Sequence, residues 1–468
     1  MGLDRVLDRI DADVPKALER LFALIRIPSI STDSAYAKDV VACAAALKAD
    51  VDSLGFQTTI HPTAGHPVVV AHRPKTGAPH VLFYGHYDVQ PVDPEALWTE
   101  PPFAPSVKEI APGRKVITGR GSADDKGQVM TFIEACRAFL ATTGDLPVGV
   151  TLLIEGEEES GSPNLPAFVE THRKQLQADI GLVCDTGMWD ADTPAITTSL
   201  RGLVYQEIVV RCADRDLHSG LYGGAAANPA HVLARIITSL HDRNGRVRIP
   251  GFYKGVTNPP AAQLANWKSL GLTEAEFLGP IGLKHSVGEK GRELIEHIQS
   301  RPTCDVNGIW GGYTGEGAKT VIAAEARAKI SFRLVGQQDP KAIAKAFAAY
   351  VKRQVPKDCS VEVIPMKGSR AFEVDYNAPA IAAARTALRQ EWGREAAAIG
   401  SGGSIPIVGD FKRILGLDCV MVGFGLEDDR VHSPNEKYDL KSFQKGTRSW
   451  ARILDALARM KPAKEPAR

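Results

Sequence analysis

Histidines and carboxylic acids gather where the apolar, strand-like segments of this sequence end. The residues are His86 and Asp88 after VLFYG, Glu157 to Glu159 after VTLLIEG, Asp185 after IGLVC, and His432 in a loop after VMVGFG. Asp124 lies in GRGSADDKG, directly before a predicted helix. In open parallel sheets, functional sites form beyond the carboxyl ends of the strands. We therefore expect these donors to converge on one rim of a sheet.

Such a set of nitrogen and oxygen donors suits a hydrolytic site with two divalent cations. Two cations about 3.5–4 Å apart polarise a carbonyl group and activate a water molecule. One carboxylate must bridge the cations, and a further carboxylate must stay within reach of the water as general base. Imidazole and carboxylate donors without thiolates favour Zn²⁺, with Mn²⁺ or Co²⁺ as alternatives.

Each of these residues also has a structural interpretation when it is taken alone. A histidine at a strand end is commonly a hydrogen-bonded structural residue, and Asp124 and Asp125 could cap the following helix. GEEESG could be a solvated acidic turn, and Asp185 a turn residue before Thr-Gly. Joint placement favours a metal site, because three adjacent glutamates at a partly buried strand end repel one another without cations.

The segments that would position these residues alternate strands with helices over the first ~195 residues. The predicted strands are HPVVVAH, HVLFYGH, VGVTLLIEG and DIGLVCD. Helical spacing is seen from Val129 to Leu140 and in an N-terminal helix with Asp13 as its N-cap. This order predicts an α/β layer with a mostly parallel central sheet flanked by helices. From about residue 372 the α/β character returns, with the strand DCVMVGFG.

The middle of the chain has a different pattern. Strand LVYQEIVVRC, a helix over 229–240, strands DVNGIW and TVIAAEARAKISFRLV, a helix over 340–351 and strand SVEVIPM follow in order. This β-α-β-β-α-β plan closes as a four-stranded, ferredoxin-like sheet with helices on one face. We predict that residues 198–369 form an inserted α+β lid and dimerisation domain. Residues 1–197 and 370–468 would form the catalytic metal-binding domain.

Composition limits the classes of function. The 468 residues are too many for one core, and a net charge of +1 argues against a nucleic-acid partner. No segment has the ~18 consecutive apolar residues of a membrane span, and we see no signal peptide. The seven cysteines form no CxxC pair, and we interpret them as buried free thiols. A cytoplasmic protein is therefore expected.

At these motifs the sequence resembles the metallopeptidase family of aminoacylase, acetylornithine and succinyl-diaminopimelate deacylases, carboxypeptidase G and the carnosinase-type dipeptidases. The matching motifs are HYDVQP, GRGSADDKG, EGEEESGS, CDTGMW, RDLHSG, KTVI with FRLV, GGSIP and VHSPNEKY. The resemblance is strongest to the cytosolic non-specific dipeptidase branch, through RDLHSG, SGGSIP and HSPNE. The motifs run in order from His86 to Tyr438 and so cover most of the chain.

The resemblance implies a role for each residue of the metal site. It implies that His86 and Asp185 bind one cation, that Glu159 and His432 bind the other, and that Asp124 bridges the two.

The remaining carboxylates of the site also receive roles from the resemblance. Glu158 would be the general base that activates the water. Asp88 would orient the imidazole of His86.

The resemblance also implies substrate contacts in the inserted domain, through which the family forms dimers. His218 would reach the partner's site and hold the carbonyl oxyanion, and Thr320 and Arg333 would contact the substrate carboxylate. Gly403 and Ser404 would line the pocket. A guanidinium suits a free carboxylate because it can donate two parallel hydrogen bonds.

The predicted function is metal-dependent hydrolysis of dipeptides or short peptides that carry a free carboxylate, by a homodimer. The alternative within the same chemistry is an N-acyl amino acid deacylase. Gly400, where the dipeptidase branch often has Arg, and Ala323, where the family has Pro, depart from the pattern in substrate-binding segments. A non-catalytic peptide- or metal-binding module is disfavoured, because Glu158 and the ligand positions are intact.

Overall fold

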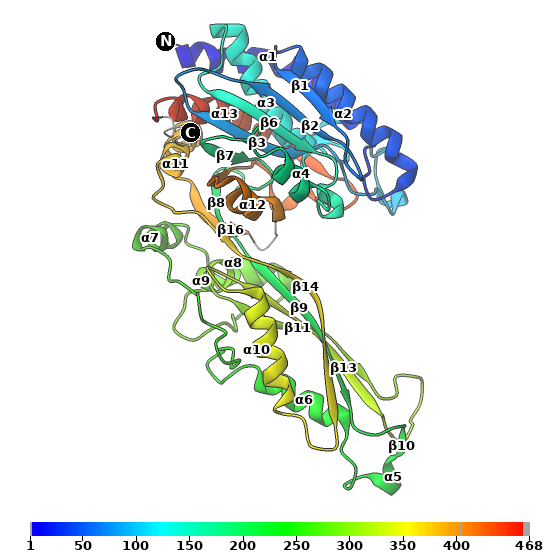
Figure 1. The fold of residues 1–468 in the computed structure, drawn as a ribbon. Helices are drawn as coiled ribbons and strands as arrows, with labels where there is room; N and C mark the ends of the chain where they lie inside the picture. The colour runs from blue at the N-terminus through cyan, green and yellow to red at the C-terminus, as the bar shows by residue number, and fades with distance from the viewer. Residues whose placement is uncertain (1, 402–404, 462–468) are drawn as a thin grey trace. The chain divides into compact units, whose positions relative to one another are not determined.

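The computed structural model describes residues 2–401 and 405–461, which form two compact units (Figure 1). The first unit spans Met1–Thr198, Val374–Ile399 and Pro406–Arg468, and the second spans Ser199–Glu373 and Gly400–Ile405. The first unit therefore contains both ends of the chain, and the second contains its middle. Gly403 and Ser404 lie outside the described residues.

A mixed sheet forms the centre of the first unit. Its strands, in spatial order, are β1 (Gln57–His61), β2 (Val68–Arg73), β6 (Gly149–Glu155), β3 (His80–His86), β7 (Ile180–Val183), β17 (Cys419–Met421), β8 (Ala195–Leu200) and β15 (Phe372–Glu373), with β16 (Ala397–Ser401) also paired with β8. Strands β6, β3, β7 and β17 are parallel, whereas the pairs β1–β2, β2–β6 and β17–β8 are antiparallel. The predicted α/β class with a mostly parallel central sheet is confirmed.

Helices cover both faces of this sheet because β3 is apolar on both. The ring of Phe83 stacks on Phe132 of α3 and meets Trp450 of α13 edge-on. The next residue, Tyr84, points to the other face, where its ring meets Phe411. The helices of the unit are α1 (Gly2–Ile25), α2 (Ala37–Asp52), α3 (Lys126–Thr143), α4 (Leu165–Thr171), α11 (Pro379–Trp392), α12 (Pro406–Asp410) and α13 (Leu440–Leu457) (Figure 1).

Two features of the first unit differ from the sequence prediction or extend it. Helix α1 begins at Gly2 and not near Asp13, because Val6, Leu7 and Ile10 continue its buried face. A small antiparallel sheet of β18 (Lys437–Asp439), β5 (Arg114–Thr118) and β4 (Ser106–Ala111) was not predicted. It joins the chain after His432 to the strand that leads into the Asp124 loop.

The second unit is built on an antiparallel sheet. Its strands, in spatial order, are β11 (Thr303–Gly311), β13 (Glu325–Leu334), β9 (Gly202–Arg211) and β14 (Ser360–Ser369). Helices α6 (Pro229–Ser239) and α10 (Pro340–Lys352) pack on β9, β13 and β14 around buried residues such as Ile208, Ile236 and Phe347. This is the ferredoxin-like order predicted from the sequence.

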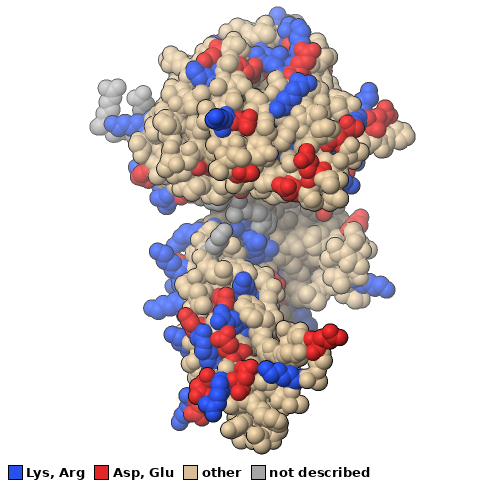
Figure 2. Space-filling model, turned by 90° about the vertical axis from the view of Figure 1, so that its right-hand side faces the viewer, with Lys and Arg blue, Asp and Glu red and all other residues tan. Residues whose placement is uncertain are grey.

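Smaller elements complete the second unit. They are β10 (Leu217–His218), β12 (Val321–Ile322), α5 (Ser219–Tyr222), α7 (Ala261–Ser269), α8 (Glu274–Leu278) and α9 (Leu294–Gln299). The segment TVIAAEARAKISFRLV, predicted as one strand, forms the separate strands β12 and β13. On the face shown in Figure 2, basic and acidic side chains are interspersed. In the second unit, Arg211 pairs with both Glu325 and Glu362 on neighbouring strands.

The interpretation of the cysteines as free thiols was wrong for two of them. Cys212 and Cys359 form a disulfide, whereas Cys43, Cys136, Cys184, Cys304 and Cys419 are free and buried. The bonded pair follows β9 and precedes β14, which pair antiparallel, so two cysteines 147 residues apart become neighbours. Within the described residues, no helix has the length and apolar character needed to span a membrane.

Candidate metal centre

The predicted ligands come from loops at the carboxyl ends of adjacent parallel strands. His86 is the last residue of β3, and its register partner Glu155 is the last residue of β6. Asp185 follows β7 by two positions, and His432 lies in the loop after β17. Asp124 comes just before α3, which begins at Lys126. Because these ends share one edge of the sheet, the donors meet there.

Asp124 lies between the two histidines. Its Oδ1 is 3.0 Å from Nε2 of His86, and its Oδ2 is 3.0 Å from Nε2 of His432. Nε2 of His432 is also 3.2 Å from Oε2 of Glu159, and Nε2 of His86 is 3.9 Å from Oδ2 of Asp185. The carboxylate of Asp124 thus places one oxygen beside each histidine.

These groups have the composition of metal sites. His86, Glu158 and Asp185 form one group, and Asp124, Glu159 and His432 form the other, with the ligand atoms of each group within 4.8 Å of one another. Both groups contain imidazole and carboxylate donors, as Zn²⁺, Mn²⁺ and Co²⁺ accept. The donor chemistry therefore fits a pair of divalent cations that share Asp124.

Crowding of the carboxylates shows why this arrangement favours cations. Burial raises the pKa of Glu158 to about 8, with the charges of Asp185 and Asp124 adding to it and His86 opposing it. Burial and the charge of Asp124 likewise raise the pKa of Asp185 to about 7. Carboxylates in such surroundings repel one another as anions, and bound cations relieve that repulsion.

The same negative charges also raise the pKa values of the two histidines, because they stabilise the protonated imidazole. Hydrogen bonds with Asp124 and Glu159 raise the pKa of His432 to about 10. Burial would lower the pKa of His86, but contacts with Asp124 and Asp88 raise it well above its usual value. Each imidazole is therefore held at a strongly negative position, where a cation would be attracted equally well.

The carboxylate of Asp88 contacts the loop after β6 as well as His86. Its Oδ1 accepts a hydrogen bond from the backbone N–H of Glu158 at 3.2 Å, and its Oδ2 accepts one from that of Glu159 at 3.1 Å. The imidazole of His86 contacts Asp88 mainly through the backbone carbonyl oxygen, 3.1 Å from Nδ1, with Oδ1 at 3.4 Å. The carboxylate therefore ties the loop after β6 to the end of β3.

Three further residues contact the site and were not predicted to do so. Oδ2 of Asp125 accepts a hydrogen bond from the backbone N–H of His86, and Nε2 of Gln90 donates one to Oε2 of Glu159 at 2.8 Å. Glu436 accepts hydrogen bonds from the loop that carries Asp124. These residues lie inside the motifs ADDKG, HYDVQP and HSPNE, respectively. Their position within the motifs could therefore have indicated a role at the site.

Three of the predicted substrate residues, His218, Thr320 and Arg333, lie in the second unit, in two places. His218 is paired with Val321, and the backbone N–H of Ser219 donates to the carbonyl oxygen of Thr320 at 3.0 Å, so His218 and Thr320 are neighbours. Arg333 lies near the far end of β13, eight residues beyond Glu325, where the strand begins. At about 3.3 Å per residue, this separation is about 26 Å.

Comparison with known proteins identifies the family. Residues 82–456 match the model of peptidase family M20/M25/M40. The chain belongs to this family. This chain is 30% identical to the Cys-Gly metallodipeptidase DUG1 of Candida albicans, and the match covers 96% of both proteins. The resemblance stated from the motifs is thereby confirmed, and the chain is a hydrolase by family.

Solved structures of the M20/M25/M40 family have the same fold. Human carnosine dipeptidase 1 superposes with a TM-score of 0.76 at 28% identity, covering 98% of this chain and 99% of that one. The metallo-carboxypeptidase Sso-CP2 of Sulfolobus solfataricus superposes with a TM-score of 0.78 at 31% identity, covering 95% and 99%.

Proposed function

We propose that this chain hydrolyses the peptide bond of dipeptides by means of two divalent cations, with Zn²⁺ as the native metal. The observation that carries the proposal is the placement of Asp124, whose two oxygens each lie 3.0 Å from a different histidine. The relatives' names support dipeptides as the substrate class, because they specify Cys-Gly and carnosine dipeptidases.

In the proposed mechanism, His86, Asp185, Glu159 and His432 would hold the cations, and Asp124 would bridge them. When bound, the cations would polarise the scissile carbonyl and lower the pKa of a water molecule. Glu158 accepts a proton from that water as it attacks the carbonyl carbon, and then passes the proton to the leaving amine as the C–N bond breaks.

Removal of the metals tests this function directly. Dialysis of the purified protein against a chelator should abolish hydrolysis of a dipeptide panel, and addition of Zn²⁺, Mn²⁺ or Co²⁺ should restore it. N-acetyl and N-succinyl amino acids assayed in parallel separate a dipeptidase from a deacylase. Hydrolysis that survives full removal of metal, verified by elemental analysis, would contradict the proposal.

We further propose that the enzyme is a cytoplasmic homodimer joined through the second unit. His218 pairs with Val321, before β13 begins, whereas Arg333 lies eight residues along β13, about 26 Å from the start of that strand. A dipeptide spans only about 7 Å. Within one chain, therefore, both residues cannot contact one dipeptide, but two chains could each contribute one of them. The edge strand β11 supports an interface, because Val306, Ile309 and Trp310 expose 42%, 59% and 41% of their surface.

Mixed dimers provide the test of this arrangement. A His218→Ala chain and an Arg333→Ala chain should each lose most activity alone, because neither homodimer has a complete substrate site. Mixed in equal amounts, they should recover about one quarter of the wild-type rate, because half of the dimers are then mixed and each mixed dimer has one complete site of two. Sedimentation should give twice the chain mass. An active monomer, or no recovery on mixing, would contradict the shared site.

A further inference from the structure

The carboxylate of Glu436 is fully buried and accepts four hydrogen bonds. Its Oε1 accepts from the backbone N–H groups of Ala123 at 2.9 Å and Asp124 at 3.1 Å. Its Oε2 accepts from the backbone N–H of Gly121 at 3.0 Å and from Nη1 of Arg120 at 2.8 Å. Three of the four donors are backbone groups of the loop that presents Asp124.

This loop needs an external support because its backbone is irregular. Gly121 has a φ of +82°, a left-handed conformation that glycine adopts without strain, and an added Cβ would lie 2.6 Å from Val89. The N–H groups of Ala123 and Asp124 point at Glu436 rather than at a neighbouring strand. Loss of the carboxylate would leave buried donors unpaired, which is costly.

The segment that supplies Glu436 also supplies His432. His432 and Asn435 both have positive φ values, of 61° and 64°, which non-glycine residues adopt only when their surroundings hold them. Oδ1 of Asn435 accepts from the backbone N–H of Thr99 at 2.7 Å, and its Nδ2 donates to the carbonyl oxygen of Leu97 at 2.9 Å. The short run from His432 to Glu436 is therefore anchored on both sides.

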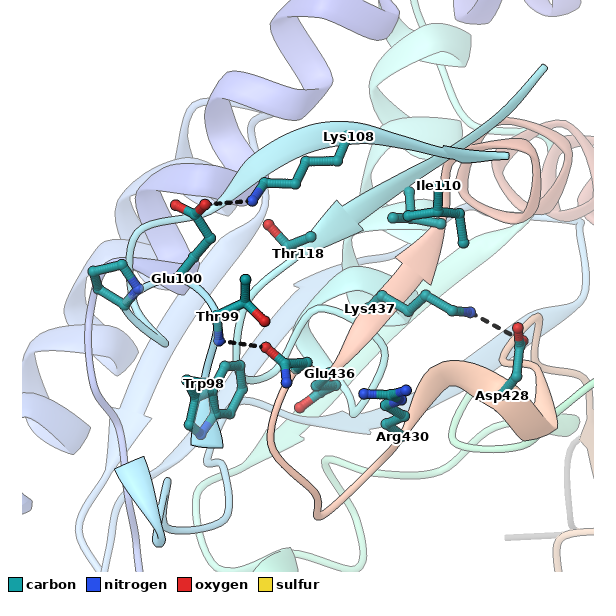
Figure 3. Close-up of a pocket in the computed structure, with 14 residues that line it drawn as sticks. Trp98, Thr99, Glu100, Lys108, Ile110, Thr118, Asp428, Arg430, Glu436 and Lys437 are labelled. Carbon is teal, nitrogen blue, oxygen red and sulfur yellow. Dashed lines mark hydrogen bonds and ion pairs between the residues drawn. The ribbon is translucent and has the colours of Figure 1, made fainter. Parts of the chain in front are cut away.

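Arg120 compensates the buried charge of Glu436. Its Nη1 bonds Glu436, its Nη2 donates to the carbonyl oxygen of Pro91 at 3.0 Å, and its guanidinium lies 5.2 Å from the ring centre of Trp98. Trp98 and Glu436 both line a cavity of about 410 Å³ that neither Asp124 nor His432 lines (Figure 3). Glu436 thus contacts the backbone of Asp124 from a cavity that the candidate ligands Asp124 and His432 do not line.

We propose that Glu436 is a positioning residue that holds the carboxylate of Asp124 between His86 and His432. It connects two members of one donor group, because a single five-residue segment carries the ligand candidate His432 and holds the backbone of Asp124. The inference rests on the proposed function, since it assigns Asp124 to a shared metal position. Partners behind metal ligands commonly contribute 10–100-fold to metal affinity.

The variant Glu436→Gln isolates this contact because it keeps the size of the side chain. In either amide orientation, the new NH₂ group faces N–H donors, either those of Ala123 and Asp124 or those of Gly121 and Arg120. The double variant Arg120→Met/Glu436→Gln removes both buried charges together, which protects folding if the single variant unfolds. Glu391→Gln is the matched control, since Glu391 is a buried carboxylate paired with Arg448 and Arg452.

Calorimetric titration of the metal-free full chain with CoCl₂, together with the visible spectrum of bound Co²⁺, gives the readout. Glu436→Gln and the double variant should bind Co²⁺ about 10–100-fold more weakly than wild type and show an altered spectrum. Glu391→Gln should bind as wild type does, even if it melts at a lower temperature. Wild-type affinity and spectrum in both Glu436 variants, or an equal loss in Glu391→Gln, would overturn the inference alone. If the wild-type chain itself binds no Co²⁺, the proposed function fails and this inference fails with it.

Discussion

Replacement of Glu158 with glutamine should lower kcat for a dipeptide by about 10²–10⁴-fold, the usual contribution of a general base. Glutamine has nearly the same size but cannot accept the proton of the attacking water. The candidate ligands His86, Asp185 and Asp124 remain, so the variant should still bind two metal ions. Steady-state kinetics and elemental analysis on the same preparation measure both quantities.

The adjacent Glu157 provides the control for this variant. Its Oε1 accepts hydrogen bonds from the backbone N–H of His66 and the side chain of Asn164, so its carboxylate is already committed to structure. Glu157→Gln makes the same charge change one residue away and should lower stability more than kcat. Full activity in Glu158→Gln would remove Glu158 from the mechanism.

Replacement of Asp124 with asparagine should have the opposite effect on metal content. Asparagine keeps only one oxygen, so it cannot place an anionic oxygen beside both His86 and His432. Metal affinity should fall by more than the roughly 10–100-fold typical of a partner behind the ligands, and activity should fall with it. Equilibrium dialysis with Zn²⁺ followed by a dipeptide assay gives both numbers.

Asp190→Asn serves as the comparison for Asp124→Asn. Asp190 stands in the same CDTGMWD segment as Asp185, but its side chain accepts hydrogen bonds from the local backbone N–H groups of Asp192 and Thr193. That variant should keep its metals and its rate. An Asp124→Asn protein that retained two tightly bound ions would contradict the shared position of Asp124.

Much of the architecture follows from local sequence pattern. Apolar runs such as HVLFYGH predict buried strands, and the observed strand β3, His80–His86, matches that run. The run is almost wholly apolar because helices cover both faces of β3. The β-α-β-β-α-β order of the middle segment likewise predicts the second sheet. Hydrophobic periodicity and the order of the elements can both be read from the local sequence. The start of α1 was predicted wrongly because Asp13 has the character of an N-cap, although the helix begins at Gly2 and continues through Asp13.

The sequence by itself determined the residue types at the strand ends, and with them the prediction of an oxygen and nitrogen metal site. Only the tertiary structure decided which atoms face one another. That Asp124 offers separate oxygens to His86 and His432, and that Glu436 holds the Asp124 loop from more than 300 positions away, depends on contacts between distant segments. The Cys212–Cys359 disulfide arises in the same way. Such contacts form because packed strands and helices bring distant loops together. The spacing of residues along the sequence does not indicate which loops become neighbours.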